Sequence, residues 1–265
     1  MNTMQQELAK IPYLGTGIGL REEISKETLE HKGEIETLEI VSDTYANPSK
    51  YTRDFLQKFK EAFPIIPHGV KLSIGSAVKL DFSYLEKLKT LCRLLNASYY
   101  SEHFAVTQMR SVHLGHLSPI WLTKESLNLV TEKVKIIQDF LEMPMVLENI
   151  TSHFDIGRAD FGETEFISEV CRRTGCGLLL DLANIHINAY NRQKDPYEFL
   201  KQFPLENLIQ IHLAGGYVDQ KEGEYFDSHS EELNGPNEGI WPLLEWVAER
   251  SNIKALIIER DFNFR

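Results

Sequence analysis

Short apolar runs alternate along this chain with longer stretches in which apolar residues recur every three to four positions. The short runs are typical of buried parallel strands, and the longer spacing is typical of helices that pack on such a sheet. There are eight β-prone runs, at residues 14–20, 37–41, 63–70, 98–103, 145–149, 177–184, 208–215 and 255–261. Because eight parallel strands close into a barrel, the pattern predicts an α/β fold of the (β/α)8 TIM-barrel type. No linker-like stretch divides the sequence, so we expect one domain over residues 1–265.

The stretches between the runs carry helix signals. Residues 85–95 and 127–141 each show an apolar stripe at helical spacing. Asp195, followed by a first-turn proline, is placed to cap a short helix, and Gly175 is placed to end an earlier one. No helical stretch follows the eighth run, so the covering helix usual after that strand is expected to be missing. We therefore expect residues 5–11, a partner protein or a second copy of the chain to cover it.

Composition and charge narrow the functional classes. The chain has 265 residues, with 28 Lys and Arg against 39 Asp and Glu, which gives a net charge of −11. This balance disfavours nucleic acid and anionic membranes as partners, because both are bound through clustered cations. The first ten residues lack the apolar core of a signal peptide, and no window approaches the roughly 20 apolar residues of a membrane helix. Three cysteines without a CxxC spacing fit a reducing cytoplasm.

Most of the eight runs end in ionisable or amide side chains. In chain order these are Glu39, His68, Glu102, His103, Glu148, Asn149, Asp181, Asn184, His212, Glu259 and Asp261. The carboxyl ends of parallel strands meet at one rim of a barrel, so residues far apart in sequence converge there. We call this rim the mouth. The pattern predicts a ring of imidazole and carboxylate groups around it.

Such crowding of carboxylates needs compensating positive charge, because like charges raise one another's pKa and burial adds a desolvation cost. Metal ions would supply that charge. Imidazole and carboxylate ligands without thiolate suit iron, manganese or zinc. The loop at residues 225–230 adds Asp227 and His229, which are close enough in sequence to reach one ion. The number of ligand candidates indicates more than one metal ion.

Some residues favour plainer interpretations. Taken alone, Glu39 is more often an ion-pair partner than a ligand. Histidines outside the runs are interpreted as loop or surface residues, namely His31, His113, His116 and His153, with His186 left open. The GTGIG sequence at 15–19 does not have the spacing of a nucleotide-binding loop and is interpreted as close backbone packing at the first strand. The three tryptophans are expected in the core or barrel cover, with one of them able to line a pocket.

Longer strings give a family resemblance that covers nearly the whole chain. They are PHGVKLSIGS, YYSEHFA, VLENITS, ETEFISEVCRRTGCGLLLDLANIHINAYN, QIHLAGG, FDSHSEE and IIERDFNF. With these strings the chain resembles the multinuclear non-haem iron-dependent oxidases of the MbnB and TglH type. The resemblance implies a xylose-isomerase-like (β/α)8 barrel that holds two or three iron ions and uses dioxygen as co-substrate.

The resemblance also implies roles for individual residues. His68, His103 and Glu148 would bind a first iron. Glu148 would bridge to a second iron, held also by Asp181, His212 and Glu259. A third site would fall to Asn184, Asp227 and His229. Glu148, Asp181 and His212 are the expected catalytic residues.

The implied substrate is a ribosomally synthesised precursor peptide, modified at cysteine or, in some relatives, at aspartate or asparagine. Relatives commonly need a small protein that recognises the leader segment. This sequence carries no appended recognition domain, so a separately encoded leader-recognition partner is expected.

Two other functional classes stay open at this point. One is a sugar isomerase or epimerase that uses divalent metal on the same barrel. Its general acid or base is not evident, since Lys71 and Lys79 follow the third run instead of lying at the mouth. The other is a zinc phosphodiesterase or a non-catalytic peptide-binding barrel, of which the DNA-acting form is disfavoured by the net charge.

Overall fold

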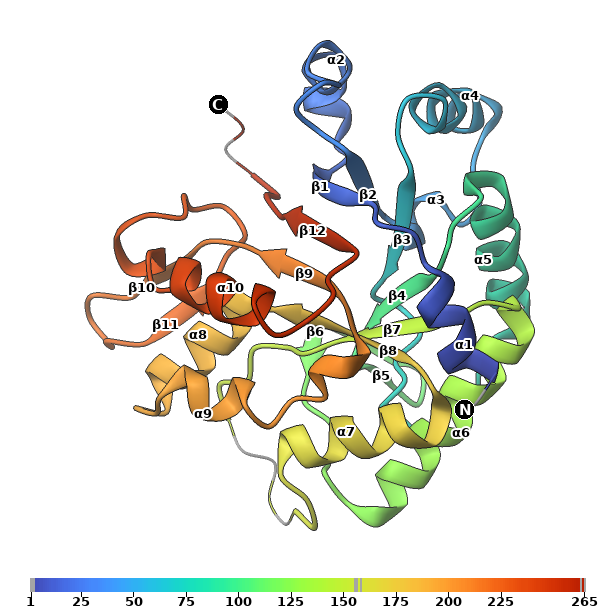
Figure 1. Cartoon of the computed structure of the whole chain (residues 1–265). Coiled ribbons are helices and arrows are strands. Elements are labelled where there is room, and N and C mark those ends of the chain that lie inside the picture. The colour runs from blue at the N-terminus through green and yellow to red at the C-terminus, as the bar shows by residue number, and fades with distance from the viewer. Residues whose placement is uncertain (1–2, 155–156, 158, 263, 265) are drawn as a thin grey trace.

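The computed structural model of the chain describes residues 3–154, 157, 159–262 and 264. Eight parallel strands form a closed barrel in the order β1, β2, β3, β4, β7, β8, β9, β12 (Figure 1). Their bounds are β1 Gly15–Gly19, β2 Thr37–Val41, β3 Ile65–Gly69, β4 Tyr100–His103, β7 Met145–Glu148, β8 Gly177–Asp181, β9 Leu208–Leu213 and β12 Ala255–Ile258. Each strand lies within one of the eight predicted runs, so the barrel prediction is confirmed.

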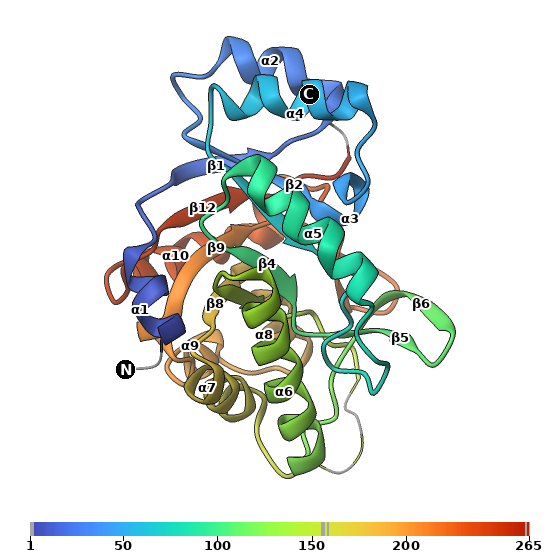
Figure 2. The same ribbon diagram turned by 90° about the vertical axis from the view of Figure 1, so that its right-hand side faces the viewer.

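Helices surround the barrel on its outer side (Figures 1 and 2). They are α1 Thr3–Lys10, α2 Ser25–Glu30, α3 Ser42–Tyr45, α4 Lys50–Lys60, α5 Phe82–Leu95, α6 Lys124–Leu141, α7 Glu163–Thr174, α8 Leu182–Asn191, α9 Pro196–Leu200 and α10 Ile240–Ala248, with short 3₁₀ turns at Glu22–Ile24, Leu205–Asn207 and Gly235–Asn237. The predicted caps are confirmed, because the Asp195 side chain accepts from the backbone N–H of Tyr197 and Gly175 ends α7 with φ 71°. None of the described helices is both long and apolar enough to span a membrane.

The apolar core lies mainly between the barrel and its helices. The stripes of α5 and α6 are buried as predicted, for example at Leu88 and Val134, which have no exposed surface. They pack in one cluster with outward residues of the strands, such as Leu147 and Leu180. Burying a side chain of this size stabilises the fold by about 1.5 to 3 kcal/mol, so this layer dominates the stability of the barrel.

The first strand packs unusually close to its neighbour. A Cβ atom placed on Gly17 would lie 1.9 Å from the carbonyl oxygen of Thr37, its register partner on β2. No side chain fits at that distance from a backbone atom. The interpretation of GTGIG as close backbone packing is therefore confirmed.

The N-terminal helix closes the floor of the barrel, opposite the mouth. Leu8 and Ile11 are buried together with Val146, Leu179 and Ile257. Leu8 also lies next to Gly177 at the amino end of β8. The Ile258 side chain on β12 keeps 37% of its surface exposed. The 5–11 segment is therefore a floor for the barrel, which differs from the cover for the eighth strand that was expected of it.

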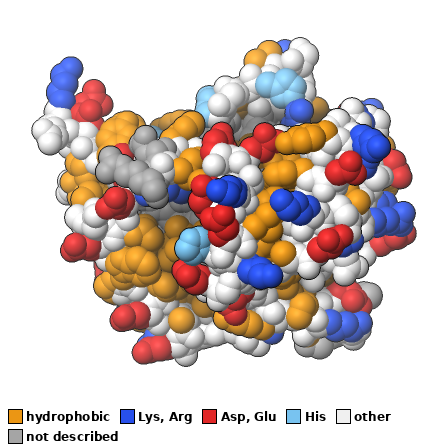
Figure 3. Space-filling model, turned by 90° about the horizontal axis from the view of Figure 1, so that it is seen from above, with side chains coloured by type: hydrophobic (Ala, Val, Ile, Leu, Met, Phe, Trp, Pro, Cys, Tyr) orange, Lys and Arg blue, Asp and Glu red, His pale blue; other side chains and the backbone are white. Residues whose placement is uncertain are grey.

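Two hairpins extend the barrel at its carboxyl ends. β5 Val106–Met109 pairs with β6 Val112–Ser118, and β10 Gly216–Val218 pairs with β11 Tyr225–Asp227. Figure 2 shows the β5–β6 hairpin projecting from the side of the barrel. Acidic and basic side chains are interspersed over the face seen in Figure 3. The net negative charge therefore does not form a field of one sign on that face.

Candidate metal centre

Strand register brings the predicted ligands together at the mouth. His103 pairs with Glu148 across β4 and β7, and Asp181 pairs with His212 across β8 and β9. Side chains alternate along a strand, so residues at paired positions point to the same side of the sheet. Here they point into the barrel, where Glu148, Asp181 and His212 are almost fully buried.

A first set of ligand atoms is formed by His68, His103 and Glu148. The Nε2 atoms of the two imidazoles lie 3.2 and 3.4 Å from Glu148 Oε2. The Nδ1 atom of His68 is 2.9 Å from Ser101 Oγ, and that of His103 is 2.9 Å from the Gly69 carbonyl oxygen. These bonds fix the rings with both Nε2 atoms directed at the carboxylate, an arrangement found around metal-binding histidines.

A second set shares Glu148 with the first. The ligand atoms of Glu148, Asp181, His212 and Glu259 all lie within 4.8 Å of one another. His212 Nδ1 is 3.2 Å from both Glu148 Oε1 and Glu259 Oε2. Asp181 Oδ1 accepts from the Asn184 N–H at 2.8 Å and so caps α8, while its Oδ2 atom faces the mouth. Glu148 is thus placed between the two sets, one oxygen toward each.

Several of these atoms are buried without a hydrogen-bond partner. They are His68 Nε2, Glu148 Oε2, Asp181 Oδ2 and Glu259 Oε2. A buried polar atom left unpaired costs roughly 1 to 3 kcal/mol, and more when it is charged. Four such atoms facing one another are the arrangement expected where a cation belongs. The donor set of nitrogen and oxygen fits iron, and manganese or zinc equally well by ligand type.

The electrostatics show how the protein balances this charge without a cation. Burial alone would lower the pKa of His68, but Glu39 and Glu148 raise it to about 9. Burial also opposes ionisation of Glu148, yet His103, His212 and His68 hold its pKa well below the usual value. Burial and then Glu148 raise the pKa of Asp181. Protons on imidazole therefore supply charge that a metal ion would replace, and metal binding would release them.

This balance gives a pH prediction for the metal-free protein. The folded pKa of His68, about 9, lies above the ordinary value of 6.5. Its stabilising contribution is therefore complete below pH 6.5 and is lost as the pH rises through 9. We expect the Tm to fall by at least about 3 °C over this interval, and to fall less in His68→Gln. Circular dichroism melts at pH 6.5 and 9 measure the Tm of both proteins. An equal fall in Tm for the wild type and His68→Gln would contradict the prediction.

A third group lies at the outer edge of the mouth. His229 Nε2 is 3.0 Å from Asp227 Oδ2 and 3.9 Å from Asp181 Oδ2. The Asn184 side chain accepts from the Thr151 hydroxyl and donates to the Asn149 carbonyl at 3.1 Å. Asp227 and His229 are therefore brought together as predicted, whereas the amide of Asn184 is bonded to the segment that follows β7.

Two strand-end residues of the predicted ring do not join it. Glu102 is adjacent to the inward-facing His103, so it points to the outside of the barrel and is buried against Tyr100 and the Leu72 N–H. Burial and Asp43 raise its pKa to about 8. Asn149 exchanges hydrogen bonds with the backbone of Asp181. Glu102 and Asn149 therefore bond to groups outside the ring of ligands and hold the strand ends in place.

Polar residues beside the ligands orient them, and of these the sequence analysis named Glu39 but missed Gln210 and Ser101. Glu39 Oε2 lies 3.2 Å from His212 Nε2, on the side of the ring away from the metal sets, in agreement with its ion-pair interpretation. The side chain of Gln210 donates from Nε2 to the same carboxylate at 2.6 Å, and its Oε1 atom accepts from the Tyr99 hydroxyl. Gln210 and Ser101 each precede a ligand by two positions, so the strand period alone could have placed them on the inner face.

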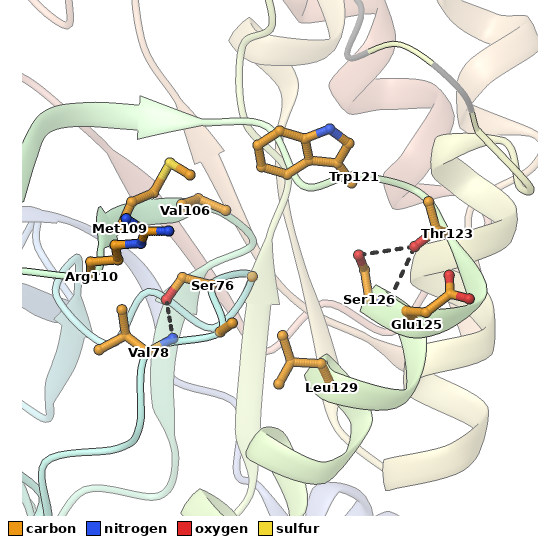
Figure 4. A pocket seen from close by; sticks show the side chains of 12 residues that line it. Ser76, Val78, Val106, Met109, Arg110, Trp121, Thr123, Glu125, Ser126 and Leu129 are labelled. Carbon is orange, nitrogen blue, oxygen red and sulfur yellow. Dashed lines mark hydrogen bonds between the residues drawn. The ribbon is translucent and has the colours of Figure 1, made fainter.

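An apolar groove lies beside the mouth, next to the β5–β6 hairpin (Figure 4). It has a volume of about 840 Å³, and its lining includes Val106, which is three residues after His103. In Figure 4, Met109 and Arg110 of the hairpin segment face Leu129 of α6. Trp121 lines the groove and is 43% exposed. The sequence interpretation allowed one of the three tryptophans to line a pocket, and Trp121 is that residue.

Comparison with known proteins agrees with the fold and the site described above. A family model described as the RiPP precursor modification enzymes MbnB/TglH/ChrH matches residues 15–265, which include every predicted ligand. The chain belongs to this family. The resemblance found in the sequence strings is thereby confirmed.

Relatives of this family member carry the name UPF0276 protein. One from Caulobacter vibrioides is 32% identical over 251 residues, which cover 94% of this chain and 88% of that protein. One from Shewanella oneidensis is 33% identical over 249 residues, with 93% and 87% covered. A longer one from Streptomyces avermitilis is 31% identical over 266 residues, which make up 53% of its length.

Solved structures place this member of the family among xylose-isomerase-like TIM barrels. D-psicose 3-epimerase from Clostridium cellulolyticum matches with a TM-score of 0.59 at 10% identity, covering 94% of this chain and 86% of that one. The 3-keto-D-glucoside 4-epimerase YcjR from E. coli matches with a TM-score of 0.58 at 11% identity, covering 94% and 93%. At this identity the likeness shows the fold alone, and it confirms the predicted fold class.

Proposed function

We propose that this chain is an iron-dependent oxidase with two or three iron ions, which uses dioxygen to modify a cysteine of a ribosomally synthesised precursor peptide. Aspartate and asparagine are the alternative target residues. The observation that carries the proposal is the place of Glu148 between two ligand sets whose facing atoms have no other partner. Membership of the family of precursor-modifying enzymes supports a peptide substrate.

The ligands would be distributed among the metal ions as follows. His68, His103 and Glu148 would hold one iron, and Glu148, Asp181, His212 and Glu259 a second. Asp227 and His229 would contribute to a third, with Asn184 joining them if its amide left Thr151. Bound iron would supply one-electron and dioxygen chemistry and would lower the pKa of a substrate thiol that it coordinates.

The residues of the chain position the metal ligands and exclude water from the site. Glu148 connects the two sets, so both would assemble or fail together. Glu39 and Gln210 hold His212 so that Nδ1 faces Glu148 and Glu259. The side chains of Glu148, His212 and Asp181 are at most 1% exposed, so water has little access to the inner part of the site. Such preorganised groups stabilise charge without reorganising during the reaction.

Partners and location are part of the same proposal. The precursor peptide would enter from the mouth, and a separately encoded protein would recognise its leader segment. The groove beside the hairpin offers apolar surface next to the mouth for a polypeptide chain, which a small sugar would not need. Cys92, Cys171 and Cys176 are all free and buried, in keeping with a reducing cytoplasm.

The sugar epimerase alternative is tested alongside. Its support is the fold of the structural neighbours, several of which act on ketoses by name. Lys71 and Lys79 are exposed, and Lys71 lies over the ring of Tyr84 instead of in the mouth. An epimerase on this barrel would therefore have to use the carboxylates that face the metal sets as its acid and base.

The deciding experiment uses protein purified without oxygen and loaded with Fe(II). A short cysteine-containing peptide encoded beside the gene is the substrate, and its Cys→Ser version is the control. We expect dioxygen uptake and a mass change that require both iron and cysteine. Inertness toward dioxygen with every neighbouring peptide would contradict the proposal, as would epimerisation of D-fructose without dioxygen.

A further inference from the structure

An ion pair joins two neighbouring strand ends at the mouth, outside both ligand sets. Arg21, just after β1, donates from Nη2 to Asp261 Oδ1 at 2.5 Å, and Asp261 follows the neighbouring strand β12. The guanidinium lies over Gly19, where a Cβ atom would be 3.0 Å from Nη1. The third glycine of GTGIG therefore leaves room for the arginine to reach the aspartate.

Asp261 in turn contacts His229 twice. Its backbone N–H donates to the His229 carbonyl at 2.7 Å, and its Oδ2 atom lies 3.6 Å from His229 Nδ1. His229 has a φ of 47°, in the left-handed region, which is uncommon for residues other than glycine although histidine occupies it more often than most. Such a conformation persists only where the surroundings hold it. Asp261 thus contacts both the backbone and the ring of His229, and Glu259 Oε2 lies 3.7 Å from the same Nδ1 atom.

The other side of the His229 ring faces unpaired ligand atoms. Its Nε2 atom lies near Asp227 Oδ2 and Asp181 Oδ2, and it has no hydrogen-bond partner. Asp181 is fully buried and its Oδ2 atom is likewise unpaired. Asp227 Oδ1 is a third such atom. His229 Nε2 thus lies between carboxylate oxygens of Asp181 and Asp227, beyond the second ligand set.

We propose that Arg21 and Asp261 are positioning residues that hold His229 over a divalent cation, bound by Asp181, Asp227 and His229 at the outer edge of the cluster. This inference rests on the proposed function, because it requires a metal cluster. It goes beyond it by making occupancy of the outermost ion depend on an ion pair that touches no metal. The inner ions would be held mainly by His68, His103, Glu148 and His212, none of which contacts the pair, so their occupancy should not depend on it.

Anaerobic titration of the metal-free full chain with Co²⁺, followed by its visible absorption and by equilibrium dialysis, tests the proposal. Arg21→Gln and Asp261→Asn should each weaken the weakest class of bound Co²⁺ at least about tenfold and leave the tighter classes unchanged. Arg21→Lys should restore most of the binding. The double variant should lose no more than either single one, because both changes break the same pair. Arg93→Gln, which breaks the exposed pair with Glu142, is the matched control and should bind like the wild type.

The outcomes separate the two levels of the account. If Arg21→Gln and Asp261→Asn bind every class of Co²⁺ like the wild type, the positioning role is wrong and the proposed function stands. If all classes weaken together, the pair acts on general stability and the positioning role is again wrong. A wild-type chain that binds no Co²⁺ at all would overturn both the inference and the proposed function.

Discussion

Glu148→Gln should release the metal ions of both ligand sets at once. The amide keeps the size of the side chain but removes the negative charge, and it cannot bridge two cations through two oxygens. Glu148 supplies one ligand atom to each set, with Oε2 toward His68 and His103 and Oε1 toward His212. We expect metal affinity to fall at least about 100-fold at both positions, and dioxygen-dependent turnover at least about 1,000-fold. Metal analysis after anaerobic gel filtration measures the first effect, and oxygen uptake the second.

Glu102→Gln is the matched control for that substitution. Glu102 is as fully buried as Glu148, but its oxygens already accept from Tyr100 and from the Leu72 and His103 N–H groups. It faces away from the mouth, so Glu102→Gln should keep the wild-type metal content. Retention of either metal set in Glu148→Gln would show that Glu148 does not bridge them.

Gly17→Ala should destabilise the barrel by about 3 kcal/mol or more, a large share of the total for a domain. The added Cβ atom would lie 1.9 Å from the Thr37 carbonyl oxygen, and both atoms belong to paired strands that cannot separate without opening the barrel between β1 and β2. Urea unfolding measures the loss as a lower midpoint with an unchanged slope.

Gly33→Ala provides the comparison. Nothing lies within 4 Å of a Cβ atom at Gly33, so this change should leave stability within about 0.5 kcal/mol of the wild type. Equal midpoints for the two variants would mean that β1 and β2 are not packed as described.

The barrel could be predicted from sequence because most of its strands are buried on both faces and read as short apolar runs. The ends of the strands and the segments that follow them were less predictable. The run at 177–184 continues past the strand, since Asp181 caps α8 and the chain becomes helical at Leu182. The β5–β6 hairpin was not predicted, because its exposed residues give no apolar alternation.

The inner site was predictable for a similar reason. A ligand at the carboxyl end of a parallel strand can be predicted without knowing which distant residues it contacts. His68, Glu148 and His212 could therefore be predicted from the strand ends alone. Period two also explains why Glu102 does not join the ring, since His103 faces inward and Glu102 must then face outward. The pairing of Arg21 with Asp261 joins residues 240 positions apart and depends on side-chain conformations that no local pattern encodes.

The central claim is that Glu148 joins two metal positions in one buried cluster. Anomalous diffraction at the iron edge, from crystals grown without oxygen from Fe(II)-loaded protein, tests it most directly. The account predicts two peaks on either side of Glu148, one among His68 and His103 and one among Asp181, His212 and Glu259. A single peak that Glu148 does not touch, or no peak in the mouth, would contradict it.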